Sequence, residues 1–439
     1  MIKRTILFFL LVLLYPASTY AKRYLGARFV FESNVDSRVV ENMRKKADLF
    51  YDALITNYSL SGWLSPLTVY YSKNESQTNQ LLSKYGFIYL KGNSYYKTGS
   101  ASVYIHQADK NKEPCGPGML YYGITRHFIA ENFKNAPEWF KEGLSRLFEE
   151  QAGIIDGTLI ISDPEPGTNF ALKEKLDKGS RPNVKILFTW TTPDKIQGYD
   201  YGYHLAQTFF YWLHTRNQLG AYLKNVQKNI SKSGYDIAIL ESTLSMDFGK
   251  INIELLDFLN KVCYAEAYLT QAVDTNDPTQ KKEALVKALE HKQDYNKARL
   301  ELVKYFHDVS EMQHCKDHLK KMLSSPVSPE HISAAVLLGN VFYIEKDYVK
   351  ACEYYTKAWN YATNYDYRYR IAYRLANSYN HLKKSDSASK WYKTFLADKW
   401  NADDMKLCSD YAQRYIDYAK KVKQAERANR IRSSPNRNP

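Results

Sequence analysis

Short, mostly apolar stretches near the start of the chain predict β-strands. Three such stretches, at residues 28–32, 67–71 and 102–106, are rich in β-branched and aromatic side chains, which favour strands. Between the first two, residues 37–56 carry apolar side chains at helical spacing. Residues 22–118 are therefore predicted to be mixed α and β.

Helical spacing dominates after the Gly- and Pro-rich loop at residues 113–118. A helix that carries His127 is expected to follow this loop and to end at the break Asn135-Ala-Pro137, and the next helix is expected over Glu138–Gln151. Residues 153–177 are rich in turn residues, and a loop is expected over residues 163–167. Three more amphipathic helices are predicted over residues 201–217, 219–233 and 253–269.

From about residue 270 the pattern becomes helix after helix, with an internal repeat. A leucine is followed by a compact residue, then by an aromatic residue, and later by a small residue and two large or apolar ones at fixed distances. The copies are Leu302, Val303, Phe306, Cys315, Leu319 and Met322, then Leu338, Gly339, Phe342, Ala351, Tyr355 and Ala358, then Leu375, Ala376, Tyr379, Ala388, Tyr392 and Phe395. Small residues allow helices to cross closely and large ones fill the space between units, so the pattern predicts stacked helix pairs.

The segments that flank the three copies do not carry the full repeat pattern. Residues 281–289 fit the end of a degenerate earlier repeat, and the increasingly charged residues 403–431 predict a capping helix. Residues 433–439 are polar and are expected to be disordered.

The first 21 residues have the composition of a secretory signal peptide. Lys3 and Arg4 precede an apolar run at residues 6–14, and cleavage is expected after Ala21. The run is shorter than the roughly 20 residues that span a bilayer. We therefore expect an exported protein, periplasmic or secreted, that does not span a membrane.

Charge and cysteine content narrow the possible partners. The 439 residues carry a formal net charge of +14, which favours anionic partners such as a charged surface, although nucleic acid is a poor candidate for an exported protein. The five cysteines, at positions 115, 263, 315, 352 and 408, form no CxxC motif. We expect them to be small buried side chains rather than metal or redox groups.

Candidate chemistry is concentrated in residues 123–150. His127 lies on a predicted helix, and the sequence Pro137-x-Trp139-Phe140-x-Glu142-Gly143-Leu144 follows it. This arrangement resembles the peptidase-MA-like domains, relatives of the gluzincins, with a general layout over roughly residues 25–230. In a gluzincin, two histidines of an HExxH helix and a glutamate of a second helix bind zinc, and the glutamate of the motif activates water.

The resemblance implies an α+β gluzincin-like domain with a degenerate site. His127 would stand at the second zinc histidine and Glu142 at the third ligand, whereas Gly123 and Ile124 would replace the first histidine and the catalytic glutamate. Neither replacement can bind zinc or accept a proton. His127 is then a core histidine, or a residual weak zinc ligand with Glu142 and Glu131, or part of a hydrolase with another base. No cofactor is expected, and weak zinc binding stays open.

The repeat resembles the tetratricopeptide repeat, which implies an α/α solenoid that binds a protein or peptide on its concave face. The inner helices would carry Leu302, Leu338 and Leu375. Aromatic and basic residues expected to line the binding groove are Tyr367, Arg370, Tyr373 and Arg374. The alternative is an array that acts only as a spacer.

These observations predict a signal peptide (1–21), a peptidase-MA-like domain with a degenerate site (22–269), a tetratricopeptide solenoid with its capping helix (270–432) and a short tail. The favoured function is an exported, non-catalytic scaffold or adaptor. The alternative is a zinc metallopeptidase with an unorthodox site that uses His127 and Glu142.

Overall fold

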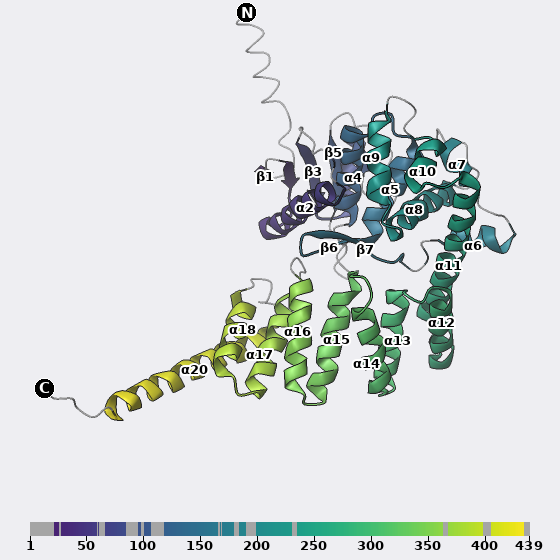
Figure 1. The fold of residues 1–439 in the computed structure, drawn as a ribbon. Coiled ribbons are helices and arrows are strands. Elements are labelled where there is room, and N and C mark those ends of the chain that lie inside the picture. The colour runs from purple at the N-terminus through teal and green to yellow at the C-terminus, as the bar shows by residue number, and fades with distance from the viewer. Residues whose placement is uncertain are drawn as a thin grey trace, which may run out of the picture. The chain divides into compact units, whose positions relative to one another are not determined.

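Most residues in the computed structural model of the chain are helical, and a small sheet lies in its first part (Figure 1). The structure describes residues 22–25, 28–58, 60, 66–84, 95–97, 101–106, 118–165, 167, 169–179, 184–189, 199–230, 235–362, 368–397 and 405–433. The chain divides into two compact units, one up to Thr270 and one from Gln271. No helix among the described residues is long and apolar enough to cross a membrane.

The first unit contains a five-stranded sheet in the order β1-β2-β3-β5-β4. The strands are β1 (Lys22–Leu25), β2 (Phe29–Ser33), β3 (Leu67–Ser72), β4 (Tyr95–Lys97) and β5 (Ser102–His106). β2, β3 and β5 are parallel, and β1 and β4 pair antiparallel at the edges. The three predicted strands are confirmed as β2, β3 and β5, whereas the short edge strands were not predicted.

Strand alternation divides the sheet into two packed faces. Phe31, Val69 and Val103 face the main core, which also contains helices α2 (Ser37–Tyr58) and α4 (Gly118–Asn132). On the opposite face Tyr70 stacks on Tyr104 with ring centroids 4.8 Å apart, beside buried leucines of α3 (Glu75–Lys84). Both faces are therefore covered, as expected for parallel strands.

The rest of the first unit is mainly helical. The helices that follow α4 are α5 (Glu138–Gln151), α6 (Phe170–Asp177), α7 (Lys185–Thr189), α8 (Tyr199–Thr215), α9 (Leu219–Lys228), α10 (Ile237–Leu244) and α11 (Phe248–Asp274). The predicted helices at 37–56, 138–151 and 201–217 are confirmed. α11 begins earlier than predicted, because the Asp247 carboxylate accepts a hydrogen bond from the Lys250 amide at 3.0 Å and caps the first turn.

The turn-rich stretch at residues 153–177 contains a hairpin and a helix that were not predicted, on either side of the expected loop. Strands β6 (Ala152–Ile155) and β7 (Thr158–Ile161) pair antiparallel there, and α6 follows. The two turn residues, Asp156 and Gly157, have φ values of 50° and 74°. An Asp-Gly pair between apolar runs favours this left-handed two-residue turn, so the hairpin signal was present in the sequence.

In the second unit, the described elements are helices that pack on their neighbours in chain order, as a solenoid does. They are α12 (Pro278–His291), α13 (Asn296–Asp308), α14 (Met312–Leu323), α15 (Glu330–Ile344), α16 (Tyr348–Tyr361), α17 (Arg368–His381), α18 (Ser385–Ala397) and α20 (Lys406–Ser433). α20 agrees with the predicted capping helix at 403–431. The predicted signal peptide lies outside the described residues, and so does the predicted tail apart from Ser433, which ends α20.

The repeat positions form the core of these helix pairs. All of them are buried except Tyr379, which is half-buried. A Cβ atom added to Gly339 on α15 would lie 2.6 Å from the Tyr355 ring on α16. The compact position of the repeat therefore lies where two helices cross closely, as the pattern predicted.

Candidate functional site

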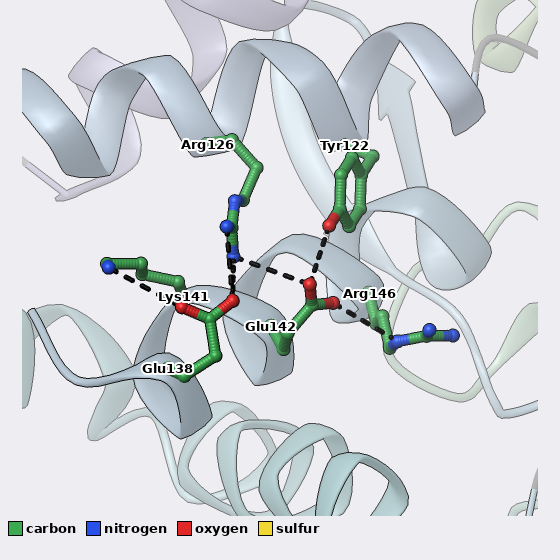
Figure 2. Close-up of polar contacts among 6 residues, drawn as sticks. All are labelled: Tyr122, Arg126, Glu138, Lys141, Glu142 and Arg146. Carbon is green, nitrogen blue, oxygen red and sulfur yellow. Dashed lines mark hydrogen bonds and ion pairs between the residues drawn. The ribbon is translucent and has the colours of Figure 1, made fainter. Parts of the chain in front are cut away.

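Glu142 of α5 is the centre of a cluster of charged groups between α4 and α5 (Figure 2). Its Oε1 accepts a hydrogen bond from the Tyr122 hydroxyl at 2.8 Å and from Arg126 Nη1 at 3.5 Å. Its Oε2 lies 3.4 Å from Arg146 Nε. Two guanidinium groups therefore balance this carboxylate.

Arg126 bridges Glu142 to a second carboxylate. Its Nη1 and Nη2 atoms both lie 3.1 Å from Glu138 Oε1, and Lys141 Nζ lies 3.5 Å from Glu138 Oε2. Three cations and two carboxylates thus form one continuous network (Figure 2).

Helical spacing explains how the sequence builds this network. Tyr122 and Arg126 are four residues apart on α4, and Glu138, Glu142 and Arg146 are successively four apart on α5. Residues at this spacing share one helix face. Pro137 ends the preceding turn and starts α5, so the two faces meet where the helices pack side by side.

Burial shifts the pKa values of groups in this cluster. The Glu142 residue is only 8% exposed. Burial, together with the Glu142 carboxylate, holds the pKa of the Tyr122 phenol well above its usual range, so it remains a hydrogen-bond donor. Burial opposes the charge of Arg126, but the Tyr122 phenol, Glu142 and Glu138 outweigh it and raise the pKa of Arg126. The guanidinium is therefore permanently charged.

His127 lies on another side of α4. It is 1% exposed and follows Arg126 directly, so it is turned by about 100° around the helix. Gly123, four residues earlier, shares its face, and a Cβ there would lie 2.5 Å from Val103 on β5. That face is turned towards the sheet. The described contacts of Glu142 therefore come from Tyr122 and Arg126, not from the expected His127.

The donor set does not fit a zinc ion. Among the described residues, no group of three or more His, Cys, Asp or Glu side chains could hold a metal. Glu131, the proposed third member, is exposed whereas His127 is buried, and the Glu142 carboxylate is taken by two arginines. Cations of the protein itself thus occupy the position next to Glu142.

Sequence reasoning missed Tyr122, Arg126, Glu138 and Arg146. In the sequence, these residues could have been recognised by their spacing. Polar groups recur every four residues on two consecutive predicted helices, in a segment whose other residues are mostly apolar. The expected ligand His127 lies one residue away from the helix face that meets α5.

The residues expected to line the repeat groove differ in burial and in contacts. Tyr367 lies outside the described residues. Arg370 is exposed and Arg374 is half-buried, where burial lowers the pKa of the Arg374 guanidinium. The Tyr373 ring packs 5.0 Å from the Phe395 ring, so this tyrosine contributes to the packing of α17 on α18.

No known protein-family model matches the chain, and a search of curated proteins finds no relative.

Proposed function

We propose that the protein is an exported, non-catalytic scaffold or adaptor that combines a pseudo-metallopeptidase domain with a protein-binding repeat array. The observation that carries this proposal is the neutralisation of Glu142 by Arg126 and Arg146. A carboxylate already balanced by two guanidinium groups is a poor ligand for a further cation.

The spacing of the cluster supports the pseudo-metallopeptidase half of the proposal. Tyr122, Gly123 and Arg126 have the spacing of the first histidine, the glutamate and the second histidine of HExxH, and Glu142 follows on the next helix. This register differs by one residue from the one that uses His127. In it, a phenol and a guanidinium replace the zinc ligands, and a glycine replaces the general base.

The alternative is a zinc metallopeptidase that uses His127 and Glu142. It requires Glu142 to leave both arginines, which would place unpaired charges in a buried site at a cost of several kcal/mol. It also requires a general base, and Ile124 and Gly123 cannot act as one. The non-catalytic function is therefore favoured.

The solenoid-like packing of the second unit supports the binding half of the proposal. A row of helix pairs presents an extended surface on its inner helices, here α13, α15 and α17. The exposed Arg370 and half-buried Arg374 on α17 give that surface positive charge, which suits an acidic or extended protein segment.

Metal analysis of residues 22–439 tests the first half. After dialysis against zinc, we expect no stoichiometric metal and no chelator-sensitive cleavage of casein. The variant Tyr122→His/Arg126→His should gain zinc, because two histidines would then face Glu142. The matched control adds His127→Ala to this double variant and should still gain zinc, because His127 lies on another face of α4. Zinc in the unmodified chain, with casein cleavage lost in His127→Ala, would establish the peptidase instead.

Crosslinking and pull-down with the full chain test the second half. Proteins captured through the repeat array should be lost with Arg370→Glu and retained with Lys357→Glu, a charge reversal at an exposed lysine of α16. Retention of every captured protein in the Arg370→Glu variant would leave the array as a spacer.

A further inference from the structure

A pocket of about 480 Å³ lies between the α17–α18 turn and α20. The turn contributes Lys383 and Lys384, α18 contributes Ser387, and α20 contributes Tyr415, Tyr418 and Val422. Lys423 and Asp386 also line it and form an ion pair with each other across it. The pocket thus combines an apolar stripe on one wall with lysines around it.

The apolar stripe continues along α20 with heptad spacing. Tyr411, Tyr415, Tyr418, Val422 and Ala425 are separated alternately by four and three residues, the spacing of a helix that packs against another helix. The first two rings pack on α18. The ring centroids of Tyr411 and Tyr415 lie 6.0 and 4.9 Å from the Tyr392 ring centroid.

The second half of the stripe lacks such cover among the described residues. Tyr418 is 67% exposed and Val422 is 37% exposed, and residues 420–426 are all exposed. In Figure 1 the yellow end of α20 runs on beyond α17 and α18. The stripe therefore extends past the helix that covers its first half, and the pocket lies where that cover ends.

The charge around the pocket indicates what can cover it. Residues 418–433 contain six Lys or Arg and one acidic residue, Glu426, and Lys383 and Lys384 add positive charge from the turn. A second copy of α20 would bring like charges together, which disfavours self-association. An acidic occupant is favoured.

We propose that the pocket and the second half of α20 dock an acidic amphipathic helix of a partner protein. An apolar side chain of that helix would fill the pocket against Tyr415, Tyr418 and Val422, and its flanking carboxylates would pair with Lys383 and Lys384, because Lys423 is already paired with Asp386. Helix-in-groove recognition uses this combination of regularly spaced apolar anchors and flanking charge. The surface is distinct from the inner helices, so the inference goes beyond the proposed function and holds without it.

A lipid surface fits the same charge less well. A helix that lies on a membrane needs a continuous apolar face, commonly with Trp, Phe or Leu. Among the described residues of α20, the exposed large apolar side chains are Tyr411, Tyr418 and Val422, and the last two border a concavity. A convex side chain of a partner fills that concavity, whereas a flat headgroup layer does not.

The test uses the chain of residues 22–439 and a fluorescent 21-residue peptide with leucine at the a and d positions and glutamate beside them. We expect saturable binding by anisotropy, at least tenfold weaker with Tyr418→Glu and with Lys383→Glu/Lys384→Glu. Lys357→Glu is the matched charge control and should bind normally. Circular dichroism of each variant checks that these exposed substitutions leave the fold intact.

Three results would overturn the proposal. A scrambled peptide of the same composition that binds equally well would reduce the effect to net charge. Sedimentation with phosphatidylserine vesicles that is lost in the same variants, without peptide binding, would assign the surface to lipid. A dimer that Tyr418→Glu dissociates would assign it to a second copy of the chain.

Discussion

Glu142 is almost fully buried, and its charge is balanced within 3.5 Å by Arg126 and Arg146. Each arginine comes from a different helix, so the cluster joins α4 to α5 through charge as well as through packing. In such a network the loss of one partner exposes the remaining charge to an apolar environment, and this costs more than the complete pair contributes.

We expect Arg126→Met to destabilise the first unit by about 2 to 4 kcal/mol, because Glu142 and Glu138 would both lose their shared cation in a buried site. Urea unfolding followed by tryptophan fluorescence measures the change. The double variant Arg126→Met/Glu142→Leu should cost less than the single one. A double variant that costs the sum of two large single effects would show that the two side chains act independently.

At the scale of elements, close helix crossings decide the packing in both units. A Cβ on Gly143 of α5 would lie 2.6 Å from the Ala206 Cβ on α8, and a Cβ on Gly339 of α15 would lie equally close to the Tyr355 ring. In the first repeat copy, Val303 and Leu319 stand at the positions of Gly339 and Tyr355. The valine is larger than the glycine, and the leucine is smaller than the tyrosine. The pair, not the glycine alone, sets the crossing.

We predict that Gly339→Ala destabilises the second unit by about 1 to 3 kcal/mol, because the added methyl group overpacks the crossing. The gain in helix propensity, about 1 kcal/mol, offsets only part of this cost. Thermal unfolding measures the effect. Adding Tyr355→Leu should make the alanine less costly than it is beside the ring, and an unchanged cost would mean that the crossing relaxes elsewhere.

At the scale of the whole molecule, buried titratable groups in both units make stability depend on pH. Burial lowers the pKa of His214 to about 4 and also lowers the pKa of His318 and His331. Burial raises the pKa of Glu149 to about 8. The histidines take up protons more readily in the unfolded chain, whereas Glu149 takes them up more readily in the folded one.

The opposite directions of these pKa shifts predict that the free energy of unfolding is greatest at an intermediate pH. The histidine contribution is present above pH 6.5 and is lost as the pH falls towards 4, whereas the Glu149 contribution is complete below pH 4.5 and is lost as the pH rises through 8. Chemical unfolding at pH 5, 6.5 and 8.5 should show the Glu149→Gln variant gaining about 1 to 3 kcal/mol over the unmodified chain at pH 8.5. No relative gain between pH 5 and 8.5 would contradict the assignment.

Elements with a regular local pattern could be predicted from the sequence alone. Strands β2, β3 and β5, helix α5 and the repeat positions from Leu302 to Phe395 follow from local spacing, because an apolar face must be buried whatever its partner. Short edge strands such as β4 were not predicted, because pairing with a neighbouring strand defines them. The start of α11 was not predicted either, because a single capping carboxylate defines it.

Which side chains contact one another across helices depends on the tertiary packing. The sequence placed Glu142 on a helix beside α4, but it could not show whether Arg126 or His127 turns towards it. One residue rotates a helical side chain by about 100°, and the packing of Gly123 on Val103 sets that rotation. In the same way, the repeat pattern placed Tyr373 on an inner helix, and the contact with Phe395 placed its ring in the core.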